Sequence, residues 1–322
     1  MTKRPLLLPL LTSLLLLIAL NLLIGAWSHR LPYYRTLEAI RAAQNPNLVF
    51  IGNSLLVNRI DEAALVQAAP GANFRPLNSA LSASKPPEHL LLFNYALRIH
   101  PSIRTVVVGI FDFQLTVPDR TQIADLTGNR IMATDSRFPL SEVASAYGFS
   151  PVGRMEFEAM RALPLVANRA NAWKFVELLR RSMDSMGMPH TATNSMGRVN
   201  DFADLEPYSV EGFETEAASF LQHPDRFNSS YESILSQASK AGVDVIVLVM
   251  PISPHHRNRF YARPIWSQYL QAVNCLAGRR GIRVIDASTW VPDQGFEDNL
   301  HMTTEAAHLF SIRLGSELAA LR

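Results

Sequence analysis

The chain has 322 residues, of which 48% are hydrophobic and 18% charged, with one cysteine and a formal net charge of +2. This length and apolar content are sufficient for a buried core in one large domain or two small ones. One cysteine excludes a disulfide framework and a cysteine-based zinc site. The low charge excludes a disordered, highly charged tail protein, and it provides no basis for a nucleic-acid partner.

The N-terminal segment Leu6–Trp27 contains no charged residue. A helix of 22 residues rises about 33 Å, which is enough to cross a hydrocarbon core of about 30 Å. Lys3 and Arg4 precede it, as in a signal peptide or a signal anchor, but the apolar run is longer than a usual signal-peptide core. We therefore predict an uncleaved transmembrane anchor over residues 1–27, embedded in the lipid bilayer. A cleaved signal peptide and a buried core helix are the alternatives.

The numbers of positive charges on the two sides of the anchor are almost equal, so they hardly favour one orientation. Lys3, Arg4 and the N-terminal amine precede the span, and Arg30, Arg35 and Arg41 follow it. Short N-terminal anchors usually keep their tail in the cytoplasm, so we expect the rest of the chain outside the cytoplasm, in the periplasm or extracellular space. Residues 28–44 are expected to be a linker.

The main domain is expected over residues 45–322. Short apolar runs of the kind found in buried parallel strands alternate with helical patterns. This alternation predicts an α/β fold, with a parallel sheet in a three-layer arrangement between helices. The strand candidates are Leu48–Ile51, Phe74–Leu77, Thr105–Ile110, Val243–Met250 and Ile282–Ile285, and the helix candidates are 61–67, 87–97, 228–241 and a final helix from Thr303. Asp61 is the expected N-cap of the first of these helices, and Thr303 or Thr304 is the expected N-cap of the last.

Residues from about 114 to 227 interrupt this alternation. The segment has few strand-like runs and contains helical pieces such as Met155–Leu163 and Ala170–Met183. It is too long to be a simple loop in a compact domain, so we expect a helical insertion or lid.

A first candidate for chemistry is Gly52-Asn53-Ser54-Leu55, directly after the first strand. Ligands of open α/β sheets bind at the carboxyl ends of the strands, and free N–H groups at a helix start can hold a negative charge there. Taken alone, an ordinary turn with a capping serine explains this tetrapeptide better.

A second candidate is Asp298-Asn299-Leu300-His301, just before the final helix. An imidazole that acts as a general base needs a hydroxyl on one nitrogen and an orienting acceptor on the other. The last crossover can return this segment to the sheet edge that holds Ser54. The two segments together are a much stronger indication than either one.

With these motifs the chain resembles the SGNH (GDSL-like) hydrolases, whose fold is flavodoxin-like. Gly52–Leu55 matches the first block, with Asn53 in place of aspartate, and Asp298–His301 matches the final DxxH block. Asn78–Ser84 is similar to the second block, with Ala83 at the position of its glycine. In the third block, Gly109–Asp112, Phe111 stands where an asparagine is expected.

The resemblance implies acyl-ester chemistry. Ser54 would be the nucleophile, His301 the general base and Asp298 the residue that orients it. The backbone N–H groups of Ser54 and Ala83 would hold the oxyanion. Gln114 is the substitute candidate for the missing third donor, and Asn53 is a further candidate in the same site.

His255 and His256 follow the strand Val243–Met250 and are expected near the same edge. A solvated loop and contact of His255 with substrate are both compatible with this position. A metal site is not favoured, because no carboxylate partner is evident. We expect neither a metal nor a cofactor.

The predicted anchor favours the functions of the membrane-tethered members of this family. The layout resembles members that acetylate exported polysaccharides or assist teichoic-acid D-alanylation, often with a membrane-bound O-acyltransferase as partner. The sequence thus predicts an extracytoplasmic serine O-acyltransferase or esterase that acts on an acylated substrate or a cell-envelope polysaccharide. A non-catalytic SGNH-like partner or scaffold, motivated by Phe111, and a lipid esterase remain alternatives.

Overall fold

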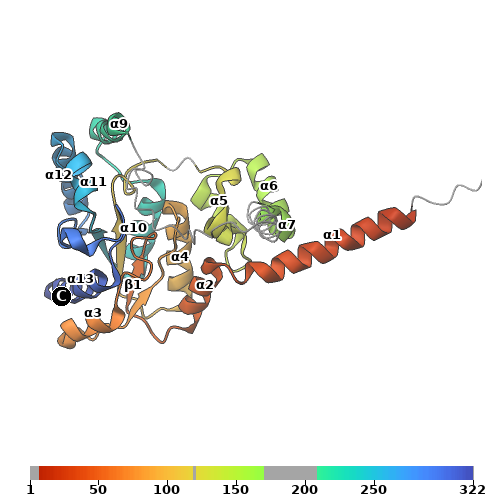
Figure 1. The fold of residues 1–322 in the computed structure, drawn as a ribbon, viewed down its shortest axis with the longest axis horizontal. Helices are drawn as coiled ribbons and strands as arrows, with labels where there is room; N and C mark the ends of the chain where they lie inside the picture. Colours follow the sequence, from red (N-terminus) through yellow and green to blue (C-terminus); the bar gives the residue numbers. More distant parts are fainter. Residues whose placement is uncertain (1–6, 119–120, 170–208, 322) are drawn as a thin grey trace, which may run out of the picture. The chain divides into compact units, whose positions relative to one another are not determined.

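A computed structural model describes residues 7–118, 121–169 and 209–321 of the chain (Figure 1). It divides into two compact units. The helical unit comprises Met1–Arg35 and Thr121–Thr193, and the sheet unit comprises Thr36–Arg120 and Asn194–Arg322. The segment expected as one insertion is therefore shared between the two units.

The sheet unit contains a five-stranded sheet in the order β2-β1-β3-β4-β5, with all neighbours parallel. Every residue of β1 and β3 is buried, as expected for strands with helices on both faces. The strand order reverses between β1 and β3, where open α/β sheets bind their ligands. The strands are β1 Leu48–Ile51, β2 Pro76–Asn78, β3 Thr105–Ile110, β4 Asp244–Val249 and β5 Arg283–Asp286.

Helices cover both faces of this sheet. On one face α3 and α13 pack together over side chains of β1, β3 and β4, and α4 packs with α10 on the other (Figure 1). The predicted three-layer α/β class is thus confirmed. The helices are α2 Pro32–Ala42, α3 Glu62–Ala68, α4 Pro86–Ile99, α9 Val210–Gln222, α10 Ser229–Ala241, α11 Pro254–His256, α12 Pro264–Arg279 and α13 Thr304–Ala320.

The predicted N-caps are confirmed. The Asp61 carboxylate accepts a hydrogen bond from the Ala64 N–H at 3.0 Å, and the Thr303 hydroxyl accepts one from the Ala306 N–H at 3.2 Å. These caps satisfy N–H groups that a helix start otherwise leaves without a partner. The Thr303 cap fixes where the last loop ends and α13 begins, close to His301.

The helical unit contains α1 Leu7–Ser28, α5 Leu140–Tyr147, α6 Pro151–Ala162 and α7 Pro164–Ala167. The part of α1 from Pro9 to Ser28 is long and apolar enough to cross a membrane, and its large side chains are exposed. The segment expected as a linker holds α2. Ser150 caps α6, which therefore starts before the predicted Met155. The predicted helix Ala170–Met183 lies outside the described residues.

Candidate active site

The turn after β1 is shaped by the close approach of β1 and β3. A Cβ atom on Gly52 would lie 2.7 Å from Leu56 Cδ1 and 2.9 Å from the Gly109 carbonyl oxygen. On Gly109 it would lie 2.4 Å from the same Leu56 atom. Glycine therefore stands directly after β1 and one residue before the end of β3, because the Leu56 side chain fills the space beside both positions. The turn that carries Ser54 and the turn after β3 are consequently neighbours at this edge.

The structure brings Ser54, His301 and Asp298 into one hydrogen-bonded chain. His301 Nε2 lies 3.0 Å from Ser54 Oγ, and His301 Nδ1 lies 2.8 Å from Asp298 Oδ2. The side chains of His301 and Asp298 keep 24% and 20% of their surface exposed. The serine and the histidine are 247 positions apart in the sequence. An acyl substrate in solvent can therefore reach the pair.

The Asp298 carboxylate determines which ring nitrogen of His301 carries the proton. Partial burial alone raises the pKa of Asp298, but hydrogen bonds from the His301 ring and from the N–H groups of Leu300 and His301 outweigh it and lower that pKa. An ionised carboxylate can only accept, so His301 Nδ1 carries the proton. The lone pair of Nε2 then faces the Ser54 hydroxyl, as a general base requires.

The loop that presents Asp298 and His301 is held at both ends. Glu297 N–H donates to the His301 carbonyl, and Thr303 N–H donates to the Gly295 carbonyl, both at 2.9 Å. Arg59, five residues after the serine, forms an ion pair with Glu297. This pair links the serine turn to the histidine loop across the site.

Two backbone N–H groups beside Ser54 are available to a ligand. Within the described part of the chain, the N–H groups of Ser54 and Ala83 donate to no other residue. The Ala83 turn folds onto the serine turn, because Leu81 N–H donates to the Gly52 carbonyl at 3.0 Å. Ala83 has a left-handed φ of +61°, a conformation that favours glycine. Unengaged backbone N–H groups on two adjoining turns are the kind of donor that an oxyanion hole uses.

A buried chain of polar side chains supports the Ala83 turn. Ser84 Oγ lies 2.6 Å from the Leu81 carbonyl and 3.1 Å from the Gly52 carbonyl. It is 2.9 Å from His89 Nε2, whose Nδ1 is 2.9 Å from the Tyr231 hydroxyl. Burial lowers the pKa of His89 to about 3, which keeps the ring neutral. A neutral ring can donate to Ser84 and accept from Tyr231, so both nitrogens are satisfied.

Two predicted site residues shape turns. The Asn53 side chain accepts from the Leu55 N–H at 3.0 Å and is 7% exposed, so it shapes the serine turn. The Gln114 carbonyl oxygen accepts from the Phe111 N–H at 3.3 Å. Because the Phe111 N–H needs an acceptor, this bond shows which end of the Gln114 amide is the oxygen. The other end is the NH₂ group, and it donates to no other described residue. Phe111 packs against the core and supplies no side-chain donor.

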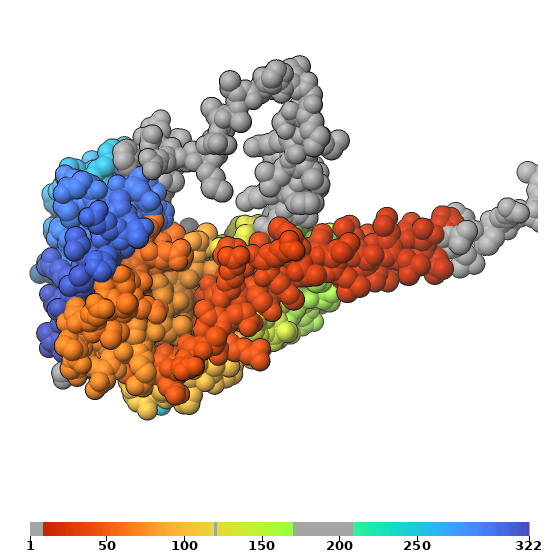
Figure 2. Space-filling model, turned by 60° about the horizontal axis from the view of Figure 1, so that its bottom comes forward, coloured from red at the N-terminus to blue at the C-terminus, as the bar shows by residue number. Residues whose placement is uncertain are grey.

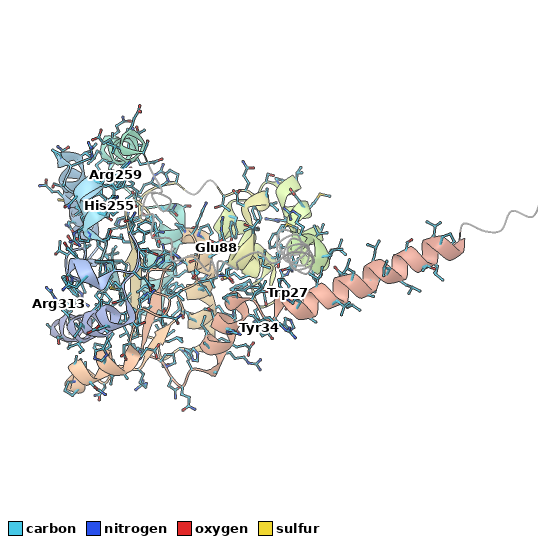
Figure 3. All side chains as sticks on the ribbon, in the orientation of Figure 1. Trp27, Tyr34, Glu88, His255, Arg259 and Arg313 are labelled. Atoms are coloured by element: carbon cyan, nitrogen blue, oxygen red, sulfur yellow. The ribbon has the colours of Figure 1, made fainter. Side chains whose placement is uncertain are left out.

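His255, a predicted substrate contact, is exposed in the structure (Figure 3), so that role stays a prediction, and the neighbouring His256 is buried. Asp112 Oδ1 accepts from His256 Nε2 and from the Tyr261 hydroxyl, each at 2.9 Å. The Tyr261 oxygen accepts from the Asp112 N–H at 3.1 Å. Burial and the Asp112 charge raise the pKa of Tyr261 well above its ordinary range, so it stays a hydroxyl.

This Asp112–His256–Tyr261 cluster clamps the turn after β3 to α11 and the turn of π-helix at Arg257–Tyr261. Sequence reasoning placed both regions at the carboxyl edge but did not pair them. The available signal was Asp112 itself, which directly follows Phe111 at the end of a buried strand. Its φ of +48° shows that the turn is tightly constrained.

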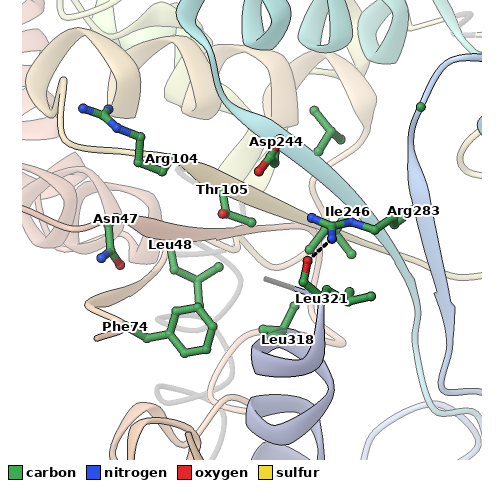
Figure 4. A pocket seen from close by; sticks show the side chains of 12 residues that line it. Asn47, Leu48, Phe74, Arg104, Thr105, Asp244, Ile246, Arg283, Leu318 and Leu321 are labelled. Atoms are coloured by element: carbon green, nitrogen blue, oxygen red, sulfur yellow. Dashed lines mark hydrogen bonds between the residues drawn. The ribbon is translucent and has the colours of Figure 1, made fainter. Parts of the chain in front are cut away.

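A cavity of about 640 Å³ lies at the other edge of the sheet (Figure 4). It is lined by residues at the amino ends of the strands, among them Arg104, Asp244 and Arg283. The triad stands at the carboxyl ends, so this cavity is separate from the candidate site. Within the described ranges, no group of three or more His, Cys, Asp or Glu side chains could hold a metal ion.

Comparisons with known proteins give structural resemblances at low sequence identity. No protein-family model and no curated protein matches the chain. A structure provisionally assigned as an acylhydrolase from Bacteroides fragilis shares 10% identity over 90% of this chain and 97% of that chain, with a TM-score of 0.42. A GDSL-like lipase from Bacteroides thetaiotaomicron shares 12% over 89% and 98%, with a TM-score of 0.38.

A catalytic mutant of an acetylxylan esterase from Geobacillus stearothermophilus shares 11% identity over 88% of this chain and 95% of that chain, with a TM-score of 0.38. At this similarity no residue role is transferred from these proteins. The roles of Ser54, His301 and Asp298 rest on their own geometry.

Proposed function

We propose that this chain is a serine esterase or O-acyltransferase of the SGNH type. The observation that supports it most is the hydrogen-bonded triad. His301 Nδ1 lies 2.8 Å from Asp298 Oδ2, and His301 Nε2 lies 3.0 Å from Ser54 Oγ. The free N–H groups of Ser54 and Ala83 beside it add the second requirement of acyl transfer, a donor pair for the oxyanion. Reactive hydroxyl, oriented base and oxyanion donors together favour an acyl carbonyl as the reacting group.

In the first half-reaction, Ser54 Oγ attacks the acyl carbonyl carbon and its proton moves to His301 Nε2. The carbonyl oxygen becomes an oxyanion held by the N–H groups of Ser54 and Ala83. Asp298 stabilises the imidazolium that forms and stays ionised. The tetrahedral intermediate collapses, the alcohol leaves with the proton from His301, and the acyl group remains on Ser54.

In the second half-reaction, His301 takes a proton from an incoming hydroxyl, which attacks the acyl-Ser54 carbonyl. Water as the acceptor releases a carboxylic acid, and a sugar hydroxyl yields a new ester. In both cases the proton returns to Ser54 and the triad is regenerated. The acceptor therefore decides between esterase and transferase, and the triad serves both.

The finer assignment of membrane and substrate is also part of this proposal. α1 has the length and composition of a single-pass anchor, and a soluble ester would require none. We propose that the chain sits in the cytoplasmic membrane with the triad outside the cytoplasm, and that it acts on cell-envelope or exported polysaccharide. A membrane-bound O-acyltransferase that supplies the acyl group is the proposed partner.

The test compares hydrolysis of an aryl acetate by the full chain in detergent, by Ser54→Ala and by Ser236→Ala. Ser236 is an exposed serine of α10, away from the triad, and provides the matched control. We expect Ser54→Ala alone to lose activity. Equal activity of the three folded proteins would overturn the proposal. Addition of oligosaccharide acceptors then separates transfer from hydrolysis.

A second candidate function is a non-catalytic partner in envelope-polymer assembly. It is favoured by one observation, the apolar Phe111 at the position where a side-chain donor is expected. A serine-reactive fluorophosphonate decides between the two. Covalent labelling of Ser54 supports the enzyme, and absence of labelling in a folded protein supports the scaffold.

A further inference from the structure

Helix α6 carries an apolar stripe on its exposed side. Its buried side is formed by Phe157 and Met160. Val152 and Met155 lie on the other side and are 75% and 72% exposed, and the exposed Ala159 follows at helical spacing. An ordinary surface helix buries one apolar stripe and presents a polar face to solvent. The second stripe of α6 therefore indicates an apolar environment outside the part of the chain that the structure describes.

This stripe continues into α7, which packs on α1. Leu163 and Val166, at and just after the end of α6, are 47% and 37% exposed. A Cβ on Gly25 of α1 would lie 3.5 Å from Pro164 Cγ. The Leu165 N–H donates to Asn21 Oδ1 at 2.9 Å. In Figure 2 the green segment that includes α6 and α7 borders the red helix α1.

The hydrogen bond to Asn21 indicates where α7 meets the anchor. Asn21 lies seven residues before Ser28, the end of α1, or about 10 Å along the helix axis. In lipid, an unpaired polar group is costly because no water can bind it. Asn21 and the Leu165 N–H satisfy each other, so both can lie at this depth. An asparagine inside an uncharged span thus has a structural reason.

The residues around the stripe fit a lipid headgroup region. Arg154 and Arg169 are exposed cations beside it, and the exposed Glu156 and Glu158 flank it on α6. Trp27 lies near the end of α1, and Tyr34 lies at the start of α2 (Figure 3). Aromatic rings and basic side chains are enriched where a protein crosses from acyl chains to headgroups. The anchor end and the α6–α7 stripe therefore present the same kind of surface.

We propose that α6 and α7 form a second membrane contact. They lie in the interface of the bilayer that α1 enters, with Val152, Met155, Leu163 and Val166 at the boundary of the acyl chains. This proposal rests on α1 crossing the membrane, as proposed above. Its consequence is that the helical unit is held against the membrane along a face, and not by a single flexible tether.

The test measures the depth of single labels in phospholipid vesicles. Cys275, the one cysteine of the chain, is exposed and is first replaced by serine. An environment-sensitive fluorophore is then attached to Met155→Cys in the full chain, and lipids with a quencher on the acyl chain are included. Arg154→Cys, an exposed neighbour toward the polar side of α6, is the matched control. Leu16→Cys in α1 reports insertion of the anchor itself.

We expect strong lipid quenching at positions 16 and 155 and at least several-fold weaker quenching at position 154. Quenching at 16 but not at 155 would overturn this inference while the anchor stands. Absence of quenching at 16 would show that α1 does not insert and would overturn both. A label at 155 shielded from lipid and from a water-soluble quencher would mean that protein covers the stripe, which also overturns the inference.

Discussion

The carboxyl edge of the sheet unit holds two Asp–His pairs with almost the same hydrogen-bond distance and different surroundings. Asp298 and His301 are 2.8 Å apart and partly exposed, and the histidine faces a serine. Asp112 and His256 are 2.9 Å apart, each 1% exposed, and their third partner is Tyr261. A short Asp–His contact alone therefore does not distinguish a reactive pair from a structural one; solvent access, the ring nitrogen that the aspartate contacts and the third partner do.

The largest expected effect is the loss of activity when the histidine of the partly exposed pair is replaced. His301→Ala removes the base that takes the Ser54 proton, so we expect aryl-ester hydrolysis to fall by about 10⁴-fold or more. The measurement is kcat with a soluble aryl acetate, and circular dichroism verifies the fold. Retention of more than about a tenth of the activity would show that His301 is not the base.

The buried pair should respond through stability. His256→Ala removes a donor to the buried Asp112 side chain, and leaving a buried polar group without its hydrogen-bond partner typically costs about 1–3 kcal/mol or more. Urea unfolding of the detergent-solubilised chain measures the change. His255→Ala, one residue away and exposed, is the matched control and should change stability by less than about 0.5 kcal/mol. Equal effects of the two variants would contradict the assignment of the cluster.

His89 extends the comparison to a buried histidine without a carboxylate partner. Its pKa of about 3 in the folded chain lies below the usual value of about 6.5. Between these values the unfolded chain binds the proton and the folded one does not, so stability falls as the pH decreases through this range. From pH 7 to 4.5 we expect a loss of about 2.5 kcal/mol in urea unfolding. In His89→Gln this part of the pH dependence should vanish, and its persistence would show that another group causes it.

The smallest expected effect on stability is that of a substitution at Ala83, in the turn that Ser84 and His89 support. Ala83 has a left-handed φ of +61°, so Ala83→Gly relieves strain while it adds freedom to the unfolded chain, and the net change should stay within about 1 kcal/mol. Since the N–H group remains, activity should persist. Ala83→Val places a branched side chain in the same conformation and should reduce both. If the glycine variant loses activity, the Ala83 N–H is not the oxyanion donor.

The parts of the site that sequence could predict are those with local signals. Ser54 follows a buried strand, and Asp298 and His301 stand just before a capped helix, so each motif is read within a few residues. The resemblance to SGNH hydrolases then placed them in one site. The parallel α/β class followed from the alternation of strands and helices in the same way.

The remaining features depend on contacts between distant segments. The Asp112–His256 bond joins residues 144 positions apart, and the two histidines 255 and 256 differ only in which one the helix turn directs inward. The bond from Leu165 to Asn21 joins residues 144 positions apart as well. No local pattern encodes such pairs, because their geometry is set by the packing of whole elements.

The most direct test of the central claim is to locate the acyl group during turnover. The full chain is mixed with an aryl acetate, quenched in acid within the first turnovers, digested and analysed by mass spectrometry. The account predicts acetyl on the peptide that contains Ser54, on the Ser54 side chain, and none in Ser54→Ala. Sustained hydrolysis with no acetyl on Ser54, or with acetyl on another residue that is required for activity, would contradict it.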